Sequence, residues 1–232
     1  MLTKCNLECN SCTANFNPVL KGLIKQERET LDQHRNTIQV DCGELIFREG
    51  LFPSGLFCLR KGKAMVLKTD KEGNRIVLSL HREVTFLGVA DYFSNKAYQS
   101  RCIALEKSEL CIISSEGVNR FLNENRNFSR RIISSLTEEQ HRINNKLLSL
   151  TTKHMSARLA DALMEMLRVF GTDDKGRIDI SMRRSDLALL CNMSVSNTIR
   201  QLSDFKKSGI ISTDGKMIEI LNIGKLKALR AK

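Results

Sequence analysis

The stretch from Arg184 to Leu202 constrains the fold more than any other part of the chain, because it encodes two short helices joined by a tight turn. Asn192 stands at the turn, where the backbone needs a residue that tolerates a left-handed φ. Ser194 then provides an N-cap for the second helix. One face of the first helix is apolar and consists of Leu187, Ala188 and Leu190. The stretch therefore predicts a helix-turn-helix.

The second helix of this motif has an apolar side and a polar side. Val195, Ile199 and Leu202 are expected to point inward, which leaves polar side chains for the outer face. Such a helix can enter the major groove of DNA, where Arg pairs with guanine and Ser or Asn reaches phosphates or other base edges. The expected DNA-contacting residues are Arg184, Ser194, Ser196, Asn197, Arg200 and Gln201. The alternative is a helical hairpin that only packs within its own domain.

Net charge supports a polyanionic partner. The chain carries 37 Lys and Arg against 26 Asp and Glu, a net charge of +11, and the excess is denser after residue 152. Trp is absent and aromatics are sparse, which argues against a surface that stacks single-stranded bases. The sequence has neither a long apolar run nor a signal peptide, so we expect a cytoplasmic protein with no membrane partner.

A second feature is an uninterrupted helical stretch between about Arg130 and Leu150. Its apolar positions recur at three- and four-residue steps once Gln140 is counted, as in a helix that packs against a partner helix. The expected homodimer interface is Ile133, Leu136, Gln140, Ile143, Leu147 and Leu150. An amphipathic helix lying on its own domain is the alternative.

The region before this helix is rich in short β-type runs. Seven candidate strands, several of them separated by Gly-containing breaks, lie between Leu45 and Ile113 at spacings of about eight to twelve residues, which favours a small antiparallel sandwich or barrel. The first twenty residues differ again, because they are polar and hold Cys5, Cys9 and Cys12. Eight Cys in an unexported chain are expected to be thiols, metal ligands or redox groups rather than structural disulfides.

Taken in order, these segments resemble the catabolite activator/FNR superfamily of bacterial transcription regulators over essentially the whole chain. The β-roll pattern of that family is similar at residues 47–50, 59–62 and 86–88, residues 98–111 look like FNR, and residues 215–220 resemble the wing. The resemblance implies an α+β fold: an N-terminal double-stranded β-helix (a jelly-roll of the cyclic-nucleotide-binding type), a long dimerisation helix and a C-terminal winged helix-turn-helix. The implied parts are a Cys-rich segment at 1–20, a β-roll sensor at 21–125, the helix at 126–151 and the DNA-binding domain at 152–232.

The cyclic-nucleotide branch of the family fits poorly. Its phosphate pocket resembles a Gly-Glu pair followed, ten residues after the Glu, by Arg-Ser. Here Gly88 is followed by Val89, and the Arg-Ser positions hold Gln99 and Ser100. Arg101 is one residue off, and a one-residue shift along a strand turns the side chain to the opposite face. We therefore do not expect cAMP as the ligand.

The cysteines point to a different signal. In FNR-like proteins four thiolates hold a [4Fe-4S] cluster, and the resemblance places three of these ligands at Cys9, Cys12 and Cys111. The fourth family position is Pro18, so we expect Cys5 to complete the set. Zinc at the same cysteines, a thiol-disulfide switch, a haem or another small effector, and the absence of sensing chemistry remain as alternatives.

The recognition helix also departs from FNR, whose Glu, Ser and Arg read the half-site. Arg200 is retained, whereas the Glu position is Ser196 and the Ser position is Ile199. The expected function is therefore a non-enzymatic homodimeric regulator that senses oxygen, NO or redox state. Its partners would be a palindromic duplex that is not the FNR consensus and, for an activator, RNA polymerase. The spacing Cys-x3-Cys-x2-Cys also occurs in radical-SAM enzymes, which makes such an enzyme the remote alternative.

Overall fold

The computed structural model describes residues 25–230, which form two compact units. The N-terminal unit comprises the described residues up to Lys68 together with His81–Arg142. The C-terminal unit comprises Thr69–Leu80 and the described residues from Ile143 on. Cys5, Cys9 and Cys12 lie outside the described residues.

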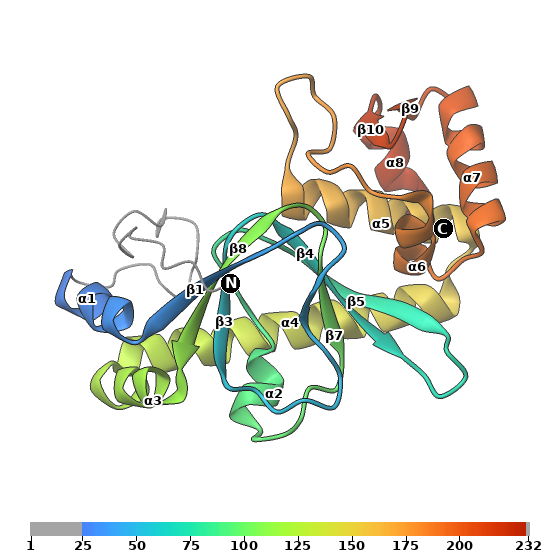
Figure 1. Cartoon of the computed structure of the whole chain (residues 1–232). Helices are drawn as coiled ribbons and strands as arrows, with labels where there is room; N and C mark the ends of the chain where they lie inside the picture. Colours follow the sequence, from blue (N-terminus) through green and yellow to red (C-terminus); the bar gives the residue numbers. More distant parts are fainter. Residues whose placement is uncertain (1–24, 231–232) are drawn as a thin grey trace. The chain divides into compact units, whose positions relative to one another are not determined.

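Two four-stranded antiparallel sheets build the β-roll (Figure 1), with strand orders β1-β8-β3-β6 and β2-β7-β4-β5. Strands that are distant in sequence are neighbours, which is typical of a jelly-roll and confirms the predicted fold class. The elements up to the long helix are α1 (Lys25–Gln33), β1 (Arg35–Val40), β2 (Leu45–Phe47), β3 (Gly55–Lys61), β4 (Lys63–Thr69), β5 (Arg75–Arg82), β6 (Thr85–Leu87), α2 (Val89–Phe93), β7 (Arg101–Ala104), β8 (Ser108–Ser114) and α3 (Ser115–Glu124).

The sequence predicted seven of these strands but not the first. β1 pairs with β8 along its whole length, from Arg35 opposite Ile113 to Val40 opposite Ser108. Its apolar residues do not alternate cleanly, so the hydrophobic pattern alone did not identify it. The short helix α2 was also not predicted.

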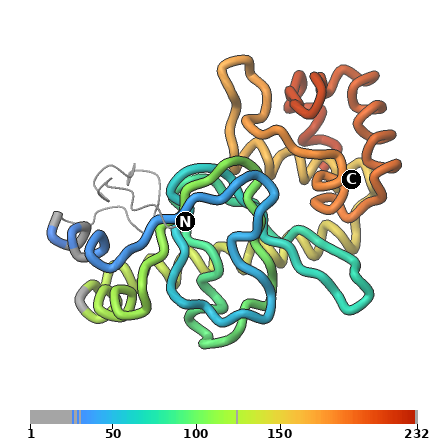
Figure 2. Tube along the Cα trace, viewed as in Figure 1, coloured from blue at the N-terminus to red at the C-terminus, as the bar shows by residue number. Residues whose placement is uncertain are grey.

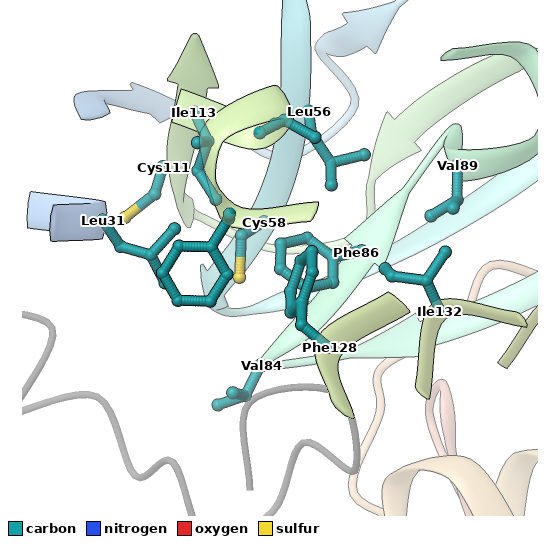
Figure 3. Close-up of a cluster of buried hydrophobic side chains, with 12 residues drawn as sticks. Leu31, Leu56, Cys58, Val84, Phe86, Val89, Cys111, Ile113, Phe128 and Ile132 are labelled. Atoms are coloured by element: carbon teal, nitrogen blue, oxygen red, sulfur yellow. The ribbon is translucent and has the colours of Figure 1, made fainter. Parts of the chain in front are cut away.

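One apolar cluster joins the first sheet to the helices that cover it (Figure 3). Phe86 from β6 and Leu31 from α1 meet Phe128 and Ile132 of the long helix there. The rings of Phe121 and Phe128 lie edge to face, with centroids 4.9 Å apart. This cluster is the part of the core that holds the start of the long helix.

The long helix α4 (Arg126–Thr152) runs without a break from one unit into the other (Figure 2). Its last turns contact α5 (Met155–Phe170) in the C-terminal unit, and the buried stripe of α5 includes Leu159, Leu163 and Met166. The remaining elements are α6 (Arg184–Cys191), α7 (Val195–Lys207), β9 (Ile211–Asp214), β10 (Met217–Ile220) and α8 (Ile223–Arg230). Ile178 forms only an isolated β-bridge, to Thr172.

Candidate DNA-binding surface and sensor site

The turn of the helix-turn-helix has the predicted chemistry. Asn192 ends α6 in a left-handed conformation, with φ 51° and ψ 55°. Ser194 caps α7, because its Oγ accepts a hydrogen bond from the backbone N–H of Asn197 at 3.2 Å. Both residues act locally, so their roles could be identified from sequence.

The faces of α7 differ from the prediction. Leu202 is buried, but Val195 and Ile199 are 43% and 51% exposed. The buried positions are instead Thr198, Leu202 and Phe205. Thr198 can be fully buried because its hydroxyl donates to the carbonyl of Ser194 at 3.0 Å. The inward assignment of Val195 and Ile199 was therefore wrong.

The outer face of α7 carries an exposed stripe with steps of three and four residues. It consists of Ser196, Ile199, Arg200 and Ser203, with Val195 beside it. The Arg200 guanidinium is positioned within the helix, since Nη2 donates to Asn197 Oδ1 at 3.2 Å. Gln201 is half-buried at the edge of this face. The stripe thus presents one cation, hydroxyl groups and two branched apolar side chains.

Arg184 contacts the wing. Its Nη2 donates to the carbonyl of Gly215 at 2.7 Å, and Nη1 reaches that of Lys216 at 3.5 Å. Partial burial lowers the pKa of this guanidinium. These bonds fix the turn between β9 and β10, so Arg184 positions the wing relative to α6. A sequence pattern could not reveal this contact, because the partners are backbone atoms some thirty residues away.

The predicted seam on α4 is mostly exposed. Ile133, Ile143 and Leu147 are exposed, and Leu147 reaches 61%. Gln140 is exposed as well, and Leu150 is half-buried. Leu136 packs partly against the apolar cluster of the N-terminal unit. Leu148, at 60% exposure, adds an apolar side chain that the seam did not include.

Cys111 is the one predicted cluster ligand within the described residues. It lies in the middle of β8 and is 4% exposed. Its Sγ accepts a hydrogen bond from Arg35 Nη1 at 3.6 Å and lies 4.0 Å from Thr37 Oγ1. Arg35 is itself held by Asp32, at 2.5 Å. A cation therefore faces the sulfur that would carry negative charge as a thiolate, and Cys111 fits the role of a thiolate ligand.

The other described cysteines occupy different environments. Cys58 is buried directly opposite Cys111 in the β3–β8 register, and both belong to the same apolar cluster (Figure 3). Burial raises the pKa of Cys102 and raises that of Cys191 to about 12. Cys42 is exposed in the turn after β1, and its thiol donates to the Leu105 carbonyl. Within residues 25–230, no three His, Cys, Asp or Glu side chains come together as a metal site.

The region that corresponds to a nucleotide pocket is occupied by aromatic packing. Tyr98 is buried and stacks on Phe47 with centroids 4.0 Å apart. A Cβ on Gly88, whose φ is +67°, would stand 2.6 Å from the Tyr98 ring. Val89 is buried in α2, and Gln99 is exposed and donates to the carbonyl of Ala97. Neither position offers the carboxylate or the cation that a cyclic nucleotide phosphate site uses.

Comparisons with known proteins agree with this architecture. Residues 37–125 match the cyclic nucleotide-binding domain, and residues 157–229 match the Crp-like helix-turn-helix domain. The chain is 25% identical to Electron transport regulator A of Shewanella oneidensis over 230 residues, covering 97% of this chain and 91% of that protein. It is 24% identical to the Fumarate and nitrate reduction regulatory protein of Salmonella typhimurium, again over 230 residues, with coverage of 97% and 91%.

A solved structure has the same fold. FixK2 from Bradyrhizobium japonicum superimposes with a TM-score of 0.78 at 18% identity, covering 85% of this chain and 98% of the other. The relatives and neighbours are transcription regulators and not enzymes, as the sequence predicted, so the radical-SAM alternative is set aside. In the described part of the chain, no helix combines the length and the apolar character needed to cross a membrane. On these domains, their order and their relatives, the chain belongs to the catabolite activator/FNR superfamily of bacterial DNA-binding transcription regulators.

Proposed function

We propose that this regulator is a cytoplasmic homodimer that binds a palindromic DNA site and senses oxygen, NO or redox state through a Cys-ligated [4Fe-4S] cluster. The proposal of a cluster-based sensor rests on the contact between the Cys111 sulfur and the Arg35 guanidinium. The observation that carries the DNA part is the exposed stripe on α7, with Arg200 at its centre.

The dimer part of the proposal is supported by the exposed apolar side chains of α4. A helix of 27 residues that leaves Ile133, Ile143 and Leu147 in solvent has a face suited to a second copy. Pairing along this face would set two recognition helices about one duplex turn apart. We expect Leu147→Glu to shift the protein to monomer in sedimentation, whereas Leu51→Glu, a change at an exposed loop leucine, should leave the dimer intact.

The sensing part is supported by the place of Cys111 in the core. The residue shares one buried cluster with Leu31 of α1 and with Phe128 and Ile132 of α4. A ligand on Cys111 would therefore act on side chains that hold the dimerisation helix. Cys5, Cys9 and Cys12 would supply the other thiolates and tie the N-terminal segment to β8. A bound cluster would contribute iron that reacts with oxygen or NO.

The predicted DNA-contacting residues have different proposed roles. Arg200 would contact guanine, Asn197 would hold its guanidinium, and Ser196 and Gln201 would reach phosphates or base edges. Ser194 already serves as the N-cap of α7. Arg184 would act through the wing turn, which it positions. If the protein activates transcription, RNA polymerase would be a further partner.

Purification under strict exclusion of oxygen tests the cluster. We expect a coloured protein with iron and acid-labile sulfide close to four of each per protomer. Cys9→Ala or Cys111→Ala should lose both the colour and oxygen-dependent regulation, while Cys42→Ala, at an exposed thiol, should keep them. Stoichiometric zinc would favour the zinc alternative, and a colourless protein with a disulfide formed in air would favour the thiol switch. Haem would be recognised by its absorbance.

A further inference from the structure

The DNA-facing stripe of α7 contains an apolar side chain that folding does not explain. Ile199 is 51% exposed, although its neighbours on the inner face, Thr198 and Leu202, are buried. Val195, one turn earlier, is also exposed, so the two branched side chains lie side by side on the same face. We propose that Ile199 is a specificity-determining residue that reads the 5-methyl group of a thymine in the major groove.

The chemistry of the groove limits what an isoleucine can recognise there. Thymine is the only one of the four bases that presents a methyl group in the major groove, and the other three differ chiefly in their hydrogen-bonding groups. The Ile199 side chain has no donor or acceptor, so it cannot form hydrogen bonds with those groups. A methyl group packed against it removes apolar surface of both partners from water, which is favourable.

The position of Ile199 beside Arg200 predicts where the thymine lies. Consecutive helix residues are only about 1.5 Å apart along the helix axis, so the bases that the two side chains reach are expected to be close together in the half-site. Arg200 is held toward the N-terminal side of α7 by Asn197. We therefore expect a thymine within two base pairs of the guanine that Arg200 contacts, once in each half-site.

This inference rests on the proposed function, because it needs α7 in the major groove. Selection from randomised duplexes, carried out with the dimer in its DNA-binding state, separates the two ideas. Failure to enrich any palindrome would overturn the DNA-recognition proposal itself. An enriched palindrome whose half-sites contain no thymine near a guanine would overturn only the role of Ile199.

The decisive step replaces each thymine of the enriched site, one symmetric pair at a time, by deoxyuridine. This removes the 5-methyl group and leaves every hydrogen-bonding group in place. For the wild-type protein, uracil at one symmetric pair of positions should weaken binding by on the order of fourfold per half-site, because one buried methyl-sized group is lost. Ile199→Ala should bind the thymine and uracil duplexes equally, because its target contact is already lost.

Two matched variants assign the contact. Leu221→Ala removes an exposed apolar side chain outside α7 and should keep the full thymine preference. Val195→Ala should keep it too. If uracil replacement has no effect at any thymine, or if Val195→Ala and not Ile199→Ala abolishes the preference, the assignment to Ile199 is wrong.

Discussion

The two ends of α4 are held by opposite kinds of interaction. Its first turns, in the N-terminal unit, bury Phe128 and Ile132 in an apolar cluster. Its last turns, in the C-terminal unit, contact α5 through the polar side chains of Lys146 and Ser149, and Lys153, which follows the helix, adds a third polar contact. Leu147 and Leu148, in the same turns, are 61% and 60% exposed.

The polar end converges on Asp161 of α5. This carboxylate accepts hydrogen bonds from Ser149 at 2.5 Å, from Lys153 at 2.8 Å and from Arg230 of α8 at 2.6 Å. Burial alone would raise the pKa of Asp161, but these bonds lower it overall. One residue therefore joins α4, α5 and α8.

Because the contacts at the two ends of α4 differ, the two ends should respond to different conditions. An apolar contact depends on volume and is nearly indifferent to salt and pH, whereas hydrogen-bonded charges respond to both. We infer that the sensor end of α4 responds to changes in core packing, such as a ligand on Cys111, and that the DNA-binding end responds to salt and pH.

The largest effect is expected at the apolar end. Phe128→Ala removes a ring that packs edge to face on Phe121 and Phe86, with centroid distances of 4.9 Å and 6.3 Å. The expected loss in unfolding free energy is about 3–5 kcal/mol, the usual cost of deleting a buried Phe. Denaturant titration measures it. Phe52→Ala, at an exposed loop position, is the matched control, and an equal loss there would contradict the assignment.

The next effect is expected at the polar end. Asp161→Ala leaves Lys153 and Arg230 without their shared carboxylate and should cost about 2–3 kcal/mol. The pKa of Asp161 is lower in the folded than in the unfolded state. Its contribution to the free energy of unfolding is therefore complete above the unfolded-state pKa near 3.8, and it is lost as pH falls through the folded-state pKa.

Acid titration of both proteins checks this pH dependence. The stability difference between wild type and Asp161→Ala should shrink below about pH 4. Asp161→Asn retains a hydrogen-bond acceptor without the charge and should fall between the two. A difference that is constant with pH would mean that the carboxylate is not the group that matters.

A smaller effect is expected from the seam between the two ends. Gln140→Leu replaces the polar residue of an otherwise apolar stripe and should tighten dimerisation by about 1 kcal/mol or more. Sedimentation at several protein concentrations measures the change. We also expect this variant to lose less of its dimer in air than the wild type; complete dissociation in air would place the switch elsewhere.

The smallest effect is expected at Lys146. Burial lowers the pKa of its ammonium, whose Nζ lies 3.8 Å from Glu165, too far for a hydrogen bond. Lys146→Met should therefore change stability at neutral pH by less than about 1 kcal/mol. The free energy of unfolding of the wild type should rise with pH between the lowered pKa of Lys146 in the folded state and its unfolded value of 10.5. The variant should lack this rise. A loss of several kcal/mol would show that the ion pair is a main support.

The sequence predicted the elements whose signals are local. The Asn192 turn, the Ser194 cap and the continuous long helix were all confirmed. The faces of α7 were not predicted correctly, because residues 195–199–202 and 198–202–205 both have helical spacing. The choice depends on the hydroxyl of Thr198, which hydrophobicity does not register.

Roles that depend on tertiary contacts could not be predicted. The bonds from Arg184 to the wing and the convergence of three side chains on Asp161 join residues that are far apart in sequence. The guanidinium beside Cys111 comes from β1, the strand that the pattern missed. The cluster ligands themselves stay a prediction, since three of the four lie outside the described residues.

The link between cluster and DNA binding is measured by the Kd for the selected palindrome, determined on a single anaerobic preparation before and after exposure to air. We expect Kd to rise at least about tenfold, a coupling within the usual allosteric range, in step with the loss of cluster absorbance. An unchanged Kd after the iron has been lost would contradict this link.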